Sequence, residues 1–288
     1  MEETAIKGQI ICASSNKYTV DLNGQTIVIN ARKKIKYKSG DILTGDFVEI
    51  ENGAISAVYP RTSRFYRPNV ANIDTLLITI SQIPKPDYRI VDKLLLSACY
   101  SDIEYAIVVN KCDLGNDTYQ YIIKHYNFCK IFAISTVTCE GIDELKEYLK
   151  GKTVAFAGQS AVGKTSILNC ILNTEYRVGH LSEKLERGKH TTTGSRIVKG
   201  ENFAVLDTPG FSEIAVDMSP DDVPNNFPPY GDYLNRCKYP DCKHFNEPDC
   251  SVINAVKNGI LSADRHDRYK EILKEIQTNY VTRYDKKH

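Results

Sequence analysis

The sequence has no hydrophobic run long enough to cross a membrane. Its longest apolar stretches, such as residues 76–80, fall far short of the roughly 18 residues that a spanning helix requires. The first four residues lack the basic and apolar segments of a signal peptide. Internal repeats and low-complexity tracts are also missing. We therefore expect a cytoplasmic protein that does not contact membranes, built of about two or three domains.

Neither sign of charge predominates, because 37 lysines and arginines face 36 aspartates and glutamates, for a net charge of +1. The charge is unevenly spread. Residues 1–67 carry a net +3, residues 68–235 a net −5, and residues 236–288 a net +3. An acidic middle between two basic ends indicates that the ends, not the middle, contact a polyanion, although charge alone does not separate this from chance.

The cysteine pattern does not indicate a disulfide framework. Six of the nine cysteines are scattered singly, which is typical of buried or inert thiols in a long cytosolic chain. The other three crowd between residues 237 and 250, beside a histidine. This clustering beside a histidine sets these three cysteines apart from the six single ones.

Two regions differ in their expected secondary structure. Residues 8–12, 18–22, 26–29 and 46–50 are rich in β-formers, and the turn residues Asn23 and Gly24 join two of these segments. About five short strands in some 60 residues are typical of a small β-barrel of the OB type. The N-terminal end of the chain is basic, so this barrel is a candidate for contact with a polyanion.

From about residue 70, strands alternate with helices. The expected strands are 74–80, 104–109, 130–134, 153–157 and 203–206, and the expected helices are 88–100, 142–149 and 166–172. This alternation predicts a parallel α/β sheet. Residues 220–229 are rich in proline and asparagine and are interpreted as a connector. Helical spacing of Tyr269, Ile272, Leu273 and Ile276 predicts a helix near the C-terminus.

The most specific motif is a GxxxxGK[ST] phosphate-binding loop at residues 158–165. An apolar strand precedes it and a helix follows it, as the motif requires. Its glycines allow the backbone to wrap around a polyphosphate with its N–H groups pointing inward. We expect Lys164 to contact the β- and γ-phosphates and Thr165 to bind Mg²⁺. The predicted nucleotide-binding residues here are Gly158, Gln159, Ser160, Ala161, Val162, Gly163, Lys164, Thr165 and Ser166.

A motif of the NKxD type directly follows the expected strand 104–109 and consists of Asn110, Lys111, Cys112 and Asp113. The Asp113 carboxylate can accept hydrogen bonds from N1–H and from the 2-amino group of guanine. Adenine lacks this pair of donors, so a site built around them rejects it. Four residues alone are weak support, but together with a phosphate loop they favour GTP over ATP. We also expect the segment ending at Ser135 to contact the base.

A DxxG element ends the expected strand 203–206 and supplies Asp207 and Gly210. We expect Asp207 to hold Mg²⁺ through water and the Gly210 N–H to contact the γ-phosphate. Residues 188–193 lie between the two phosphate elements and contain three consecutive threonines, of which Thr192 is expected to complete the Mg²⁺ shell. A threonine run also fits a solvated turn, but this position favours the role in nucleotide binding.

The motifs are circularly permuted, because in ordinary small GTPases the phosphate loop precedes NKxD. Such an order is possible when the original termini of a domain lie close together. The state of the γ-phosphate can then pass directly from the DxxG element to residues 211–288.

Catalysis departs from the Ras-like pattern, because Phe211 stands where those enzymes carry a water-orienting glutamine. Another residue or a partner must then orient the attacking water. His190 is the candidate catalytic residue beside Lys164, although a lone histidine is more often structural.

Three cysteines and one histidine, Cys237, Cys242, His244 and Cys250, lie within fourteen residues. Three thiolates and an imidazole suit a tetrahedral Zn²⁺ ion, and a closed set of four ligands indicates one structural ion. Chance clustering of buried cysteines is the alternative.

Together these elements resemble the small ribosomal subunit biogenesis GTPase family RsgA over nearly the whole chain. The resemblance rests on the N-terminal barrel, Asn72-Ile73-Asp74, the permuted NKCD, phosphate-loop, GKHTTT and DTPGF elements, and the CxxxxCxHxxxxxC cluster. This sequence has Gly188-Lys189 where the family more often has Gly-Arg. The resemblance implies an OB-fold RNA-binding domain at residues 1–65, a circularly permuted α/β P-loop GTPase domain at 66–218 and a mostly helical zinc-binding domain at 219–288.

The resemblance also implies GTP/GDP, Mg²⁺ and Zn²⁺ as ligands. The implied partner is the small ribosomal subunit with its ribosomal RNA, which would stimulate the GTPase late in subunit maturation. We expect a monomer. Residues 32–38 contain five cations and Tyr37, which suits contact with RNA phosphates and bases, although a solvated loop has the same composition.

Two other functions remain open at this point. The chain can be an RNA-docking GTP switch with little turnover of its own, or a kinase or ATPase that uses the same phosphate loop. Asp113 disfavours the kinase or ATPase. Measuring GTP turnover with and without small subunits distinguishes the RNA-docking switch from a ribosome-dependent GTPase.

Overall fold

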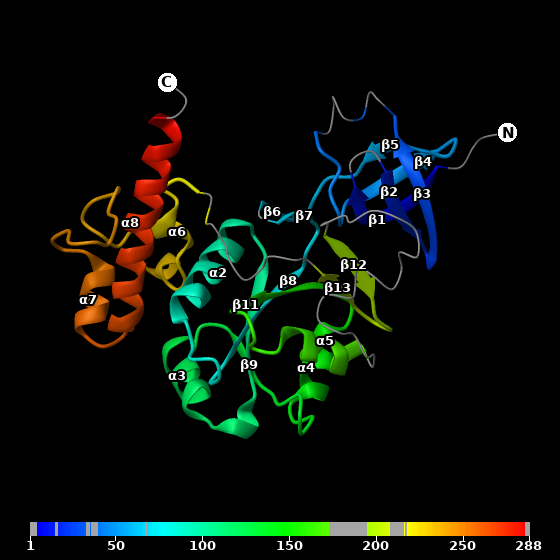
Figure 1. Ribbon diagram of the computed structural model, residues 1–288. Coiled ribbons are helices and arrows are strands. Elements are labelled where there is room, and N and C mark those ends of the chain that lie inside the picture. The colour runs from blue at the N-terminus through cyan, green and yellow to red at the C-terminus, as the bar shows by residue number, and fades with distance from the viewer. Residues whose placement is uncertain are drawn as a thin grey trace. The chain divides into compact units, whose positions relative to one another are not determined.

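A computed structural model describes residues 5–14, 17–32, 35, 40–66, 68–172, 195–207, 216 and 218–285 (Figure 1). Contacts divide the chain into two compact units. The first comprises Met1–Leu76, Ile142–Phe156 and Lys164–Phe211, and the second comprises Leu77–Gly141, Ala157–Gly163 and Ser212–His288. The domain boundaries expected at residues 65 and 218 are not tested by this division and stay predictions. No helix among the described residues is long and apolar enough to cross a membrane.

The first unit begins with the expected barrel. Its strands are β1 (Ile6–Ser14), β2 (Lys17–Leu22), β3 (Gln25–Ala31), β4 (Phe47–Glu51) and β5 (Ala54–Val58). They pair in the order β1-β2-β3-β5-β4, and β4 pairs again with β1, which closes the ring. All pairs are antiparallel except β3–β5. The five-stranded barrel of the OB type is therefore confirmed.

Alternation of apolar and polar residues explains the barrel core. The inward side chains of the strands and of the segment before β4 form one buried cluster: Ile10, Tyr18, Val20, Ile35, Ile42, Val48, Ile50 and Ile55. The expected turn between β2 and β3 forms at Asn23 and Gly24, which both have positive φ. Asparagine and glycine tolerate this conformation best, and it matches the twist of a tight hairpin.

The first unit also contains elements beyond the barrel. They are the separate two-stranded hairpin of β6 (Arg64–Tyr66) and β7 (Asn69–Ala71), α4 (Ile142–Leu149), β11 (Thr153–Gly158), of which Thr153–Phe156 lies in this unit, α5 (Lys164–Leu172), β12 (Arg196–Lys199) and β13 (Ala204–Asp207). β11 and β13 are parallel, as expected for an α/β sheet. β12 was not anticipated. It is antiparallel to β13 and also pairs with β1, so it joins the barrel to the α/β sheet.

The second unit contains the remaining strands and most of the helices. The strands are β8 (Thr75–Ser81), of which Leu77–Ser81 lies in this unit, β9 (Glu104–Asn110) and β10 (Lys130–Ala133). β9 and β10 are parallel. Their helices are α2 (Tyr88–Tyr100), η1 (Cys112–Leu114) and α3 (Asp117–His125), and α2 begins at the side-chain cap of Asp87. β8 is fully buried, which explains its continuous apolar sequence.

The C-terminal part of the second unit is mostly helical. It comprises α6 (Val223–Asn226), η2 (Tyr230–Tyr233), α7 (Ser251–Lys257) and α8 (Ala263–Asp285). The four residues that predicted the C-terminal helix are all buried on α8. The interpretation of residues 220–229 as a connector was wrong. This segment forms α6 and buries Val223 and Phe227 in the core around α8, and Pro224 is tolerated because it lies in the first turn of α6.

Candidate nucleotide-binding loops and metal centre

The phosphate-loop motif follows β11 and ends where α5 begins at Lys164. Gly158 and Gly163 have φ of 137° and 96°. A Cβ on Gly158 would lie 2.1 Å from the carbonyl oxygen of Thr79 on β8, and one on Gly163 would lie 2.3 Å from Nδ2 of Asn110. Both glycines are therefore required by backbone conformation and by close approach.

The NKxD segment is bonded to the phosphate loop inside the second unit. Asn110 donates from Nδ2 to the carbonyl oxygen of Val162 at 2.9 Å. Lys111 donates from Nζ to the carbonyl oxygens of Ala161 at 2.8 Å and Ile83 at 2.7 Å. Two elements separated by about fifty residues in the sequence thus form one structure.

Two polar side chains at this junction were not assigned specific contacts from the sequence. The Oδ1 atom of Asn110 is buried and has no hydrogen-bond partner among the described residues, so a bound molecule can donate to it. Gln159, inside the phosphate loop, accepts a hydrogen bond at Oε1 from the backbone N–H of Asp87 at 3.3 Å. The loop is therefore also connected to the N-terminus of α2.

The Asp113 carboxylate is held by a serine. Ser135 is buried and donates from Oγ to Oδ1 of Asp113 at 2.6 Å. The same Oγ accepts the backbone N–H groups of Val137 and Thr138. Burial raises the pKa of the neighbouring Cys112 thiol, which is therefore un-ionised at neutral pH. The sequence predicted a backbone contact at residue 135, and the structure adds a side chain that fixes the direction of Asp113.

Two charged groups of the first unit are partly removed from water. Burial lowers the pKa of the Lys164 ammonium. Burial raises the pKa of the Asp207 carboxyl, and Arg196 opposes this shift. Both pKa shifts mean that burial disfavours the charged form of the side chain. A phosphate bound beside Lys164 and a cation bound beside Asp207 would stabilise these charged forms.

The other predicted residues of the phosphate loop differ in exposure. Thr165 is half-buried in the first turn of α5, whereas Ser160 and Ser166 are exposed. The predicted roles of His190, Thr192 and Gly210, together with the observation on Phe211, fall outside the described residues.

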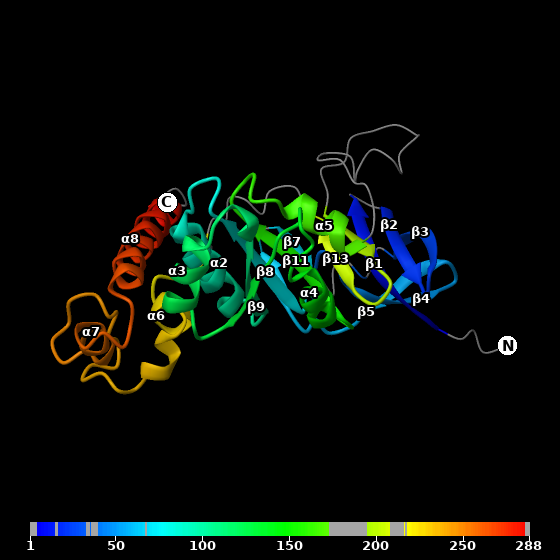
Figure 2. The same ribbon diagram turned by 90° about the horizontal axis from the view of Figure 1, so that it is seen from below.

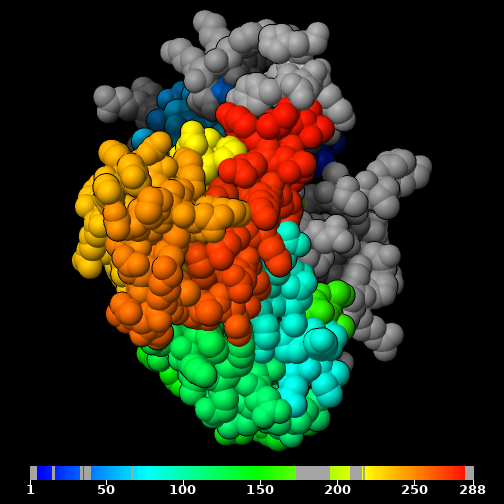
Figure 3. Space-filling view, turned by 90° about the vertical axis from the view of Figure 1, so that its left-hand side faces the viewer, coloured from blue at the N-terminus to red at the C-terminus, as the bar shows by residue number. Residues whose placement is uncertain are grey.

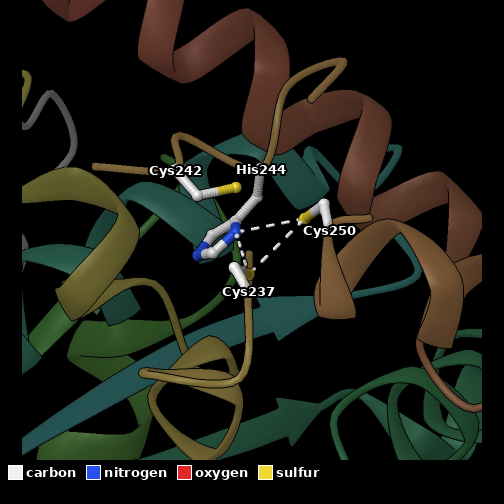
Figure 4. Close-up of side chains that lie close together, drawn as sticks. All are labelled: Cys237, Cys242, His244 and Cys250. Carbon is white, nitrogen blue, oxygen red and sulfur yellow. Dashed lines mark hydrogen bonds between the residues drawn. The ribbon is translucent and has the colours of Figure 1, made fainter. Parts of the chain in front are cut away.

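The four cysteine and histidine side chains predicted to bind metal come together in the second unit (Figure 4). Their ligand atoms all lie within 4.8 Å of one another. Sγ of Cys237 is 3.9 Å from Sγ of Cys250 and 3.6 Å from Nδ1 of His244. Nδ1 of His244 is 3.3 Å from Sγ of Cys250. Cys242, His244 and Cys250 are buried, and Cys237 is half-buried.

These distances fit a tetrahedral zinc ion. Zn–S bonds of about 2.3 Å and Zn–N bonds of about 2.0–2.1 Å place two sulfur ligands about 3.8 Å apart and a sulfur and a nitrogen about 3.5 Å apart. Burial lowers the pKa of His244, so its imidazole is neutral and can donate a lone pair from Nδ1. The donor set therefore fits Zn²⁺, and it leaves no position for a substrate.

The loop around the cluster is fixed by its own hydrogen bonds. Glu247 accepts the backbone N–H groups of Lys243, Phe245 and Asn246. Oγ of Ser251 lies 3.0 Å from Sγ of Cys237, and Cys250 is the N-cap residue of α7. These contacts orient the ligands before any ion binds.

Three comparisons with known proteins agree with one another. The family model described as RsgA GTPase matches residues 58–217. The small ribosomal subunit biogenesis GTPase RsgA of Thermotoga petrophila is 35% identical over 286 residues, which cover 94% of this chain and 96% of that protein. The crystal structure of YjeQ from Thermotoga maritima is 31% identical, with a TM-score of 0.79, over 95% of this chain and 99% of that one. The crystal structure of YloQ, a circularly permuted GTPase, is 27% identical, with a TM-score of 0.76, over 96% of each chain.

Proposed function

This chain belongs to the RsgA GTPase family and is a GTP hydrolase, and we propose that it acts late in maturation of the small ribosomal subunit, which stimulates its hydrolysis of GTP. The observation that carries this proposal is the similarity to the RsgA protein of Thermotoga petrophila over 94% of the chain. The proposed partner is the small subunit with its ribosomal RNA. That partner places the protein in the cytoplasm, and we propose that it acts there as a monomer.

We propose that guanine is recognised by Asp113 and Asn110. Ser135 holds one carboxylate oxygen of Asp113, and this orients the group to accept from N1–H and the 2-amino group of guanine. Asn110 has a buried acceptor with no partner among the described residues. Lys111 and Cys112 complete the segment, and the hydrogen bond from Lys111 to Ala161 keeps the base-recognition and phosphate loops in register.

The phosphates are proposed to bind along residues 158–166, with the backbone N–H groups and Lys164 neutralising their charge. Thr165 and Asp207 would hold Mg²⁺, and Thr192 and Gly210 would complete the shell of Mg²⁺ and γ-phosphate contacts. The ion that Thr165 and Asp207 would hold would supply positive charge to neutralise the negative charge that develops during transfer. Lys164 would stabilise the same charge from the protein side.

Hydrolysis itself needs a group that orients water, and Phe211 cannot do this. We propose that His190 takes this role when the small subunit is bound. Its replacement by alanine should lower the subunit-stimulated rate and leave GTP affinity unchanged, which single-turnover hydrolysis on saturating subunits measures. Equal rates for wild type and the alanine variant would mean that the small subunit, not His190, orients the attacking water.

The zinc ion is proposed to be structural, with Cys237, Cys242, His244 and Cys250 as ligands. It would stabilise the fold of the loop between η2 and α7, which supplies all four ligands. We propose that this region and the barrel contact ribosomal RNA, since both ends of the chain are basic. Most of the basic segment 32–38 lies outside the described residues.

Co-sedimentation with purified small subunits tests the proposed partner. The protein should pellet with small subunits in the presence of a non-hydrolysable GTP analogue and less with GDP. Large subunits serve as the control. Equal recovery with both subunits would contradict a specific role in small-subunit maturation.

A further inference from the structure

A buried carboxylate on α2 joins two arginines of α8, away from the nucleotide loops and the metal cluster. Asp92 accepts at Oδ1 from Nε of Arg265 at 2.9 Å and at Oδ2 from Nε of Arg268 at 2.6 Å. The side chains of Asp92, Arg265 and Arg268 are 0%, 4% and 16% exposed. We call these three residues the Asp92 triad. Figure 2 shows α8 beside α2 and α3, and Figure 3 shows α8 lying along that side of the second unit.

Both guanidinium groups make further contacts beside those with Asp92. Arg265 donates from NH2 to the carbonyl oxygen of Pro228 at 2.8 Å, and its guanidinium lies 4.5 Å from the ring centre of Tyr126. Arg268 donates to the hydroxyls of Tyr121 at 3.2 Å and Tyr126 at 3.1 Å. A planar guanidinium surrounded in this way has one allowed orientation, so the triad fixes α8 in rotation as well as in position.

A second layer of charges, more exposed than the triad, also joins α2 to α8. On the same face of α2, Lys93 donates to Glu275 of α8 at 2.7 Å, and Arg89 pairs with the same carboxylate. These side chains are 18–39% exposed, so they contribute less than the buried pairs. Together the two layers place one face of α2 along α8.

The metal-binding loop also packs against α8. Tyr269 follows Arg268 in the sequence and is fully buried. Its ring packs against Tyr230 with centres 4.9 Å apart, and Tyr230 meets the ring of His244 edge-on at 5.8 Å. The hydroxyl of Tyr269 also donates to the carbonyl oxygen of Lys243. α8 therefore contacts α2 through the Asp92 triad and the metal-binding loop through Tyr269.

The N-terminus of α2 contacts the phosphate loop. Asp87 caps the helix with its side chain, and its backbone N–H donates to Gln159 of the loop. One rigid helix thus contacts the phosphate loop at its first turn and α8 along its length.

We propose that Asp92 is a positioning residue, which holds α8 and its metal-binding loop in one orientation on α2 so that a bound small subunit can stimulate hydrolysis. This inference rests on the proposed function for the stimulation and on the contacts above for the orientation. Buried ion triads add little net stability, yet removing one member leaves uncompensated charge and loosens the pairing. Loss of Asp92 should therefore affect the stimulated rate and not the intrinsic one.

The test uses the full-length, zinc-containing protein with Asp92→Asn. We expect faster hydrogen exchange in α8 amides, with zinc content, GTP affinity and intrinsic hydrolysis unchanged. Because small misplacement of a catalytic assembly is costly, the subunit-stimulated rate should fall about tenfold or more. The matched control is Asp267→Asn, which removes an exposed carboxylate of α8 that pairs with half-buried Lys270, and it should behave as wild type.

Two results would overturn the proposal: a stimulated rate for Asp92→Asn equal to that of wild type, or unchanged exchange in α8. If Asp92→Asn does not fold, Glu275→Gln in the outer layer replaces it as the test variant. We expect it to lower the stimulated rate to a smaller extent. An unchanged stimulated rate would contradict the proposal. If wild type itself is not stimulated, the proposed function fails and the stimulation part of this inference fails with it. The exchange data still decide whether the triad holds α8.

Discussion

The hydrogen bond from Ser135 to Asp113 gives the sharpest prediction for nucleotide recognition. Ser135→Ala removes a donor that lies 2.6 Å from Oδ1 of the carboxylate. It also removes the acceptor for two loop N–H groups, those of Val137 and Thr138. The carboxylate then rotates more freely, and part of the binding energy for guanine goes into ordering it.

The magnitude follows from the type of bond. A hydrogen bond to a charged group contributes about 1.5–3 kcal/mol, and water entering the site recovers part of it. We expect a loss near the lower end, about 1.4 kcal/mol, which corresponds to about tenfold weaker binding of GTP and of GDP. Equal losses are expected because both nucleotides carry the same base.

Titration with a fluorescent guanine nucleotide measures this directly. The matched control is Thr278→Ala, which removes an exposed hydroxyl of α8, outside the proposed nucleotide site. A second arm uses Asp113→Asn, which should shift preference from GTP toward xanthosine triphosphate, because the amide presents a donor where N1–H needs an acceptor. In that background Ser135→Ala should cost much less. Binding by Ser135→Ala within twofold of wild type would refute the reasoning.

Three further predictions concern the phosphate loop, the metal and acid stability. Gly163→Ala forces a Cβ to 2.3 Å from Asn110 at positive φ, so GTP binding should weaken roughly ten- to hundredfold by titration, while Gly231→Ala, with open space around it, binds normally. Cys250→Ala should lose zinc in metal analysis and speed exchange in α7, and retention of zinc would contradict the assigned ligands. Burial lowers the pKa of His266 to about 4, from 6.5 in the unfolded chain. Between these two pH values the imidazole is protonated only in the unfolded chain, so a fall in pH favours unfolding. Urea unfolding should therefore show up to about 3 kcal/mol less stability at pH 4 than above pH 6.5, and His266→Gln should flatten the slope.

Local patterns in the sequence predicted the elements that carry their own signals. The helices 88–100 and 142–149 form with the predicted bounds, since apolar periodicity and the Asp87 cap define them within a few residues. Gly158 and Gly163 were predicted at a phosphate loop, and the structure adds the reason, which is the close approach of Thr79 and Asn110.

Features that depend on distant partners were missed. β12 joins β1 through the single register pair Cys12 and Arg196, and nothing near either residue indicates the other. The ion pair of Asp92 with Arg265 spans 173 positions, and charged residues on amphipathic helices are usually solvated. Proline and asparagine in residues 220–229 suggested a connector, whereas burial there depends on α8, which comes later in the chain.

The central claim is that the small ribosomal subunit stimulates GTP hydrolysis by this chain. The most direct measurement is the turnover of GTP at saturating nucleotide, with no subunits, with small subunits and with large subunits. An activating group delivered by a partner is worth on the order of 10³–10⁵ in comparable systems, so we predict slow turnover alone and a large increase with small subunits only. Turnover that small subunits leave unchanged would contradict the claim and favour an RNA-docking switch with little turnover of its own.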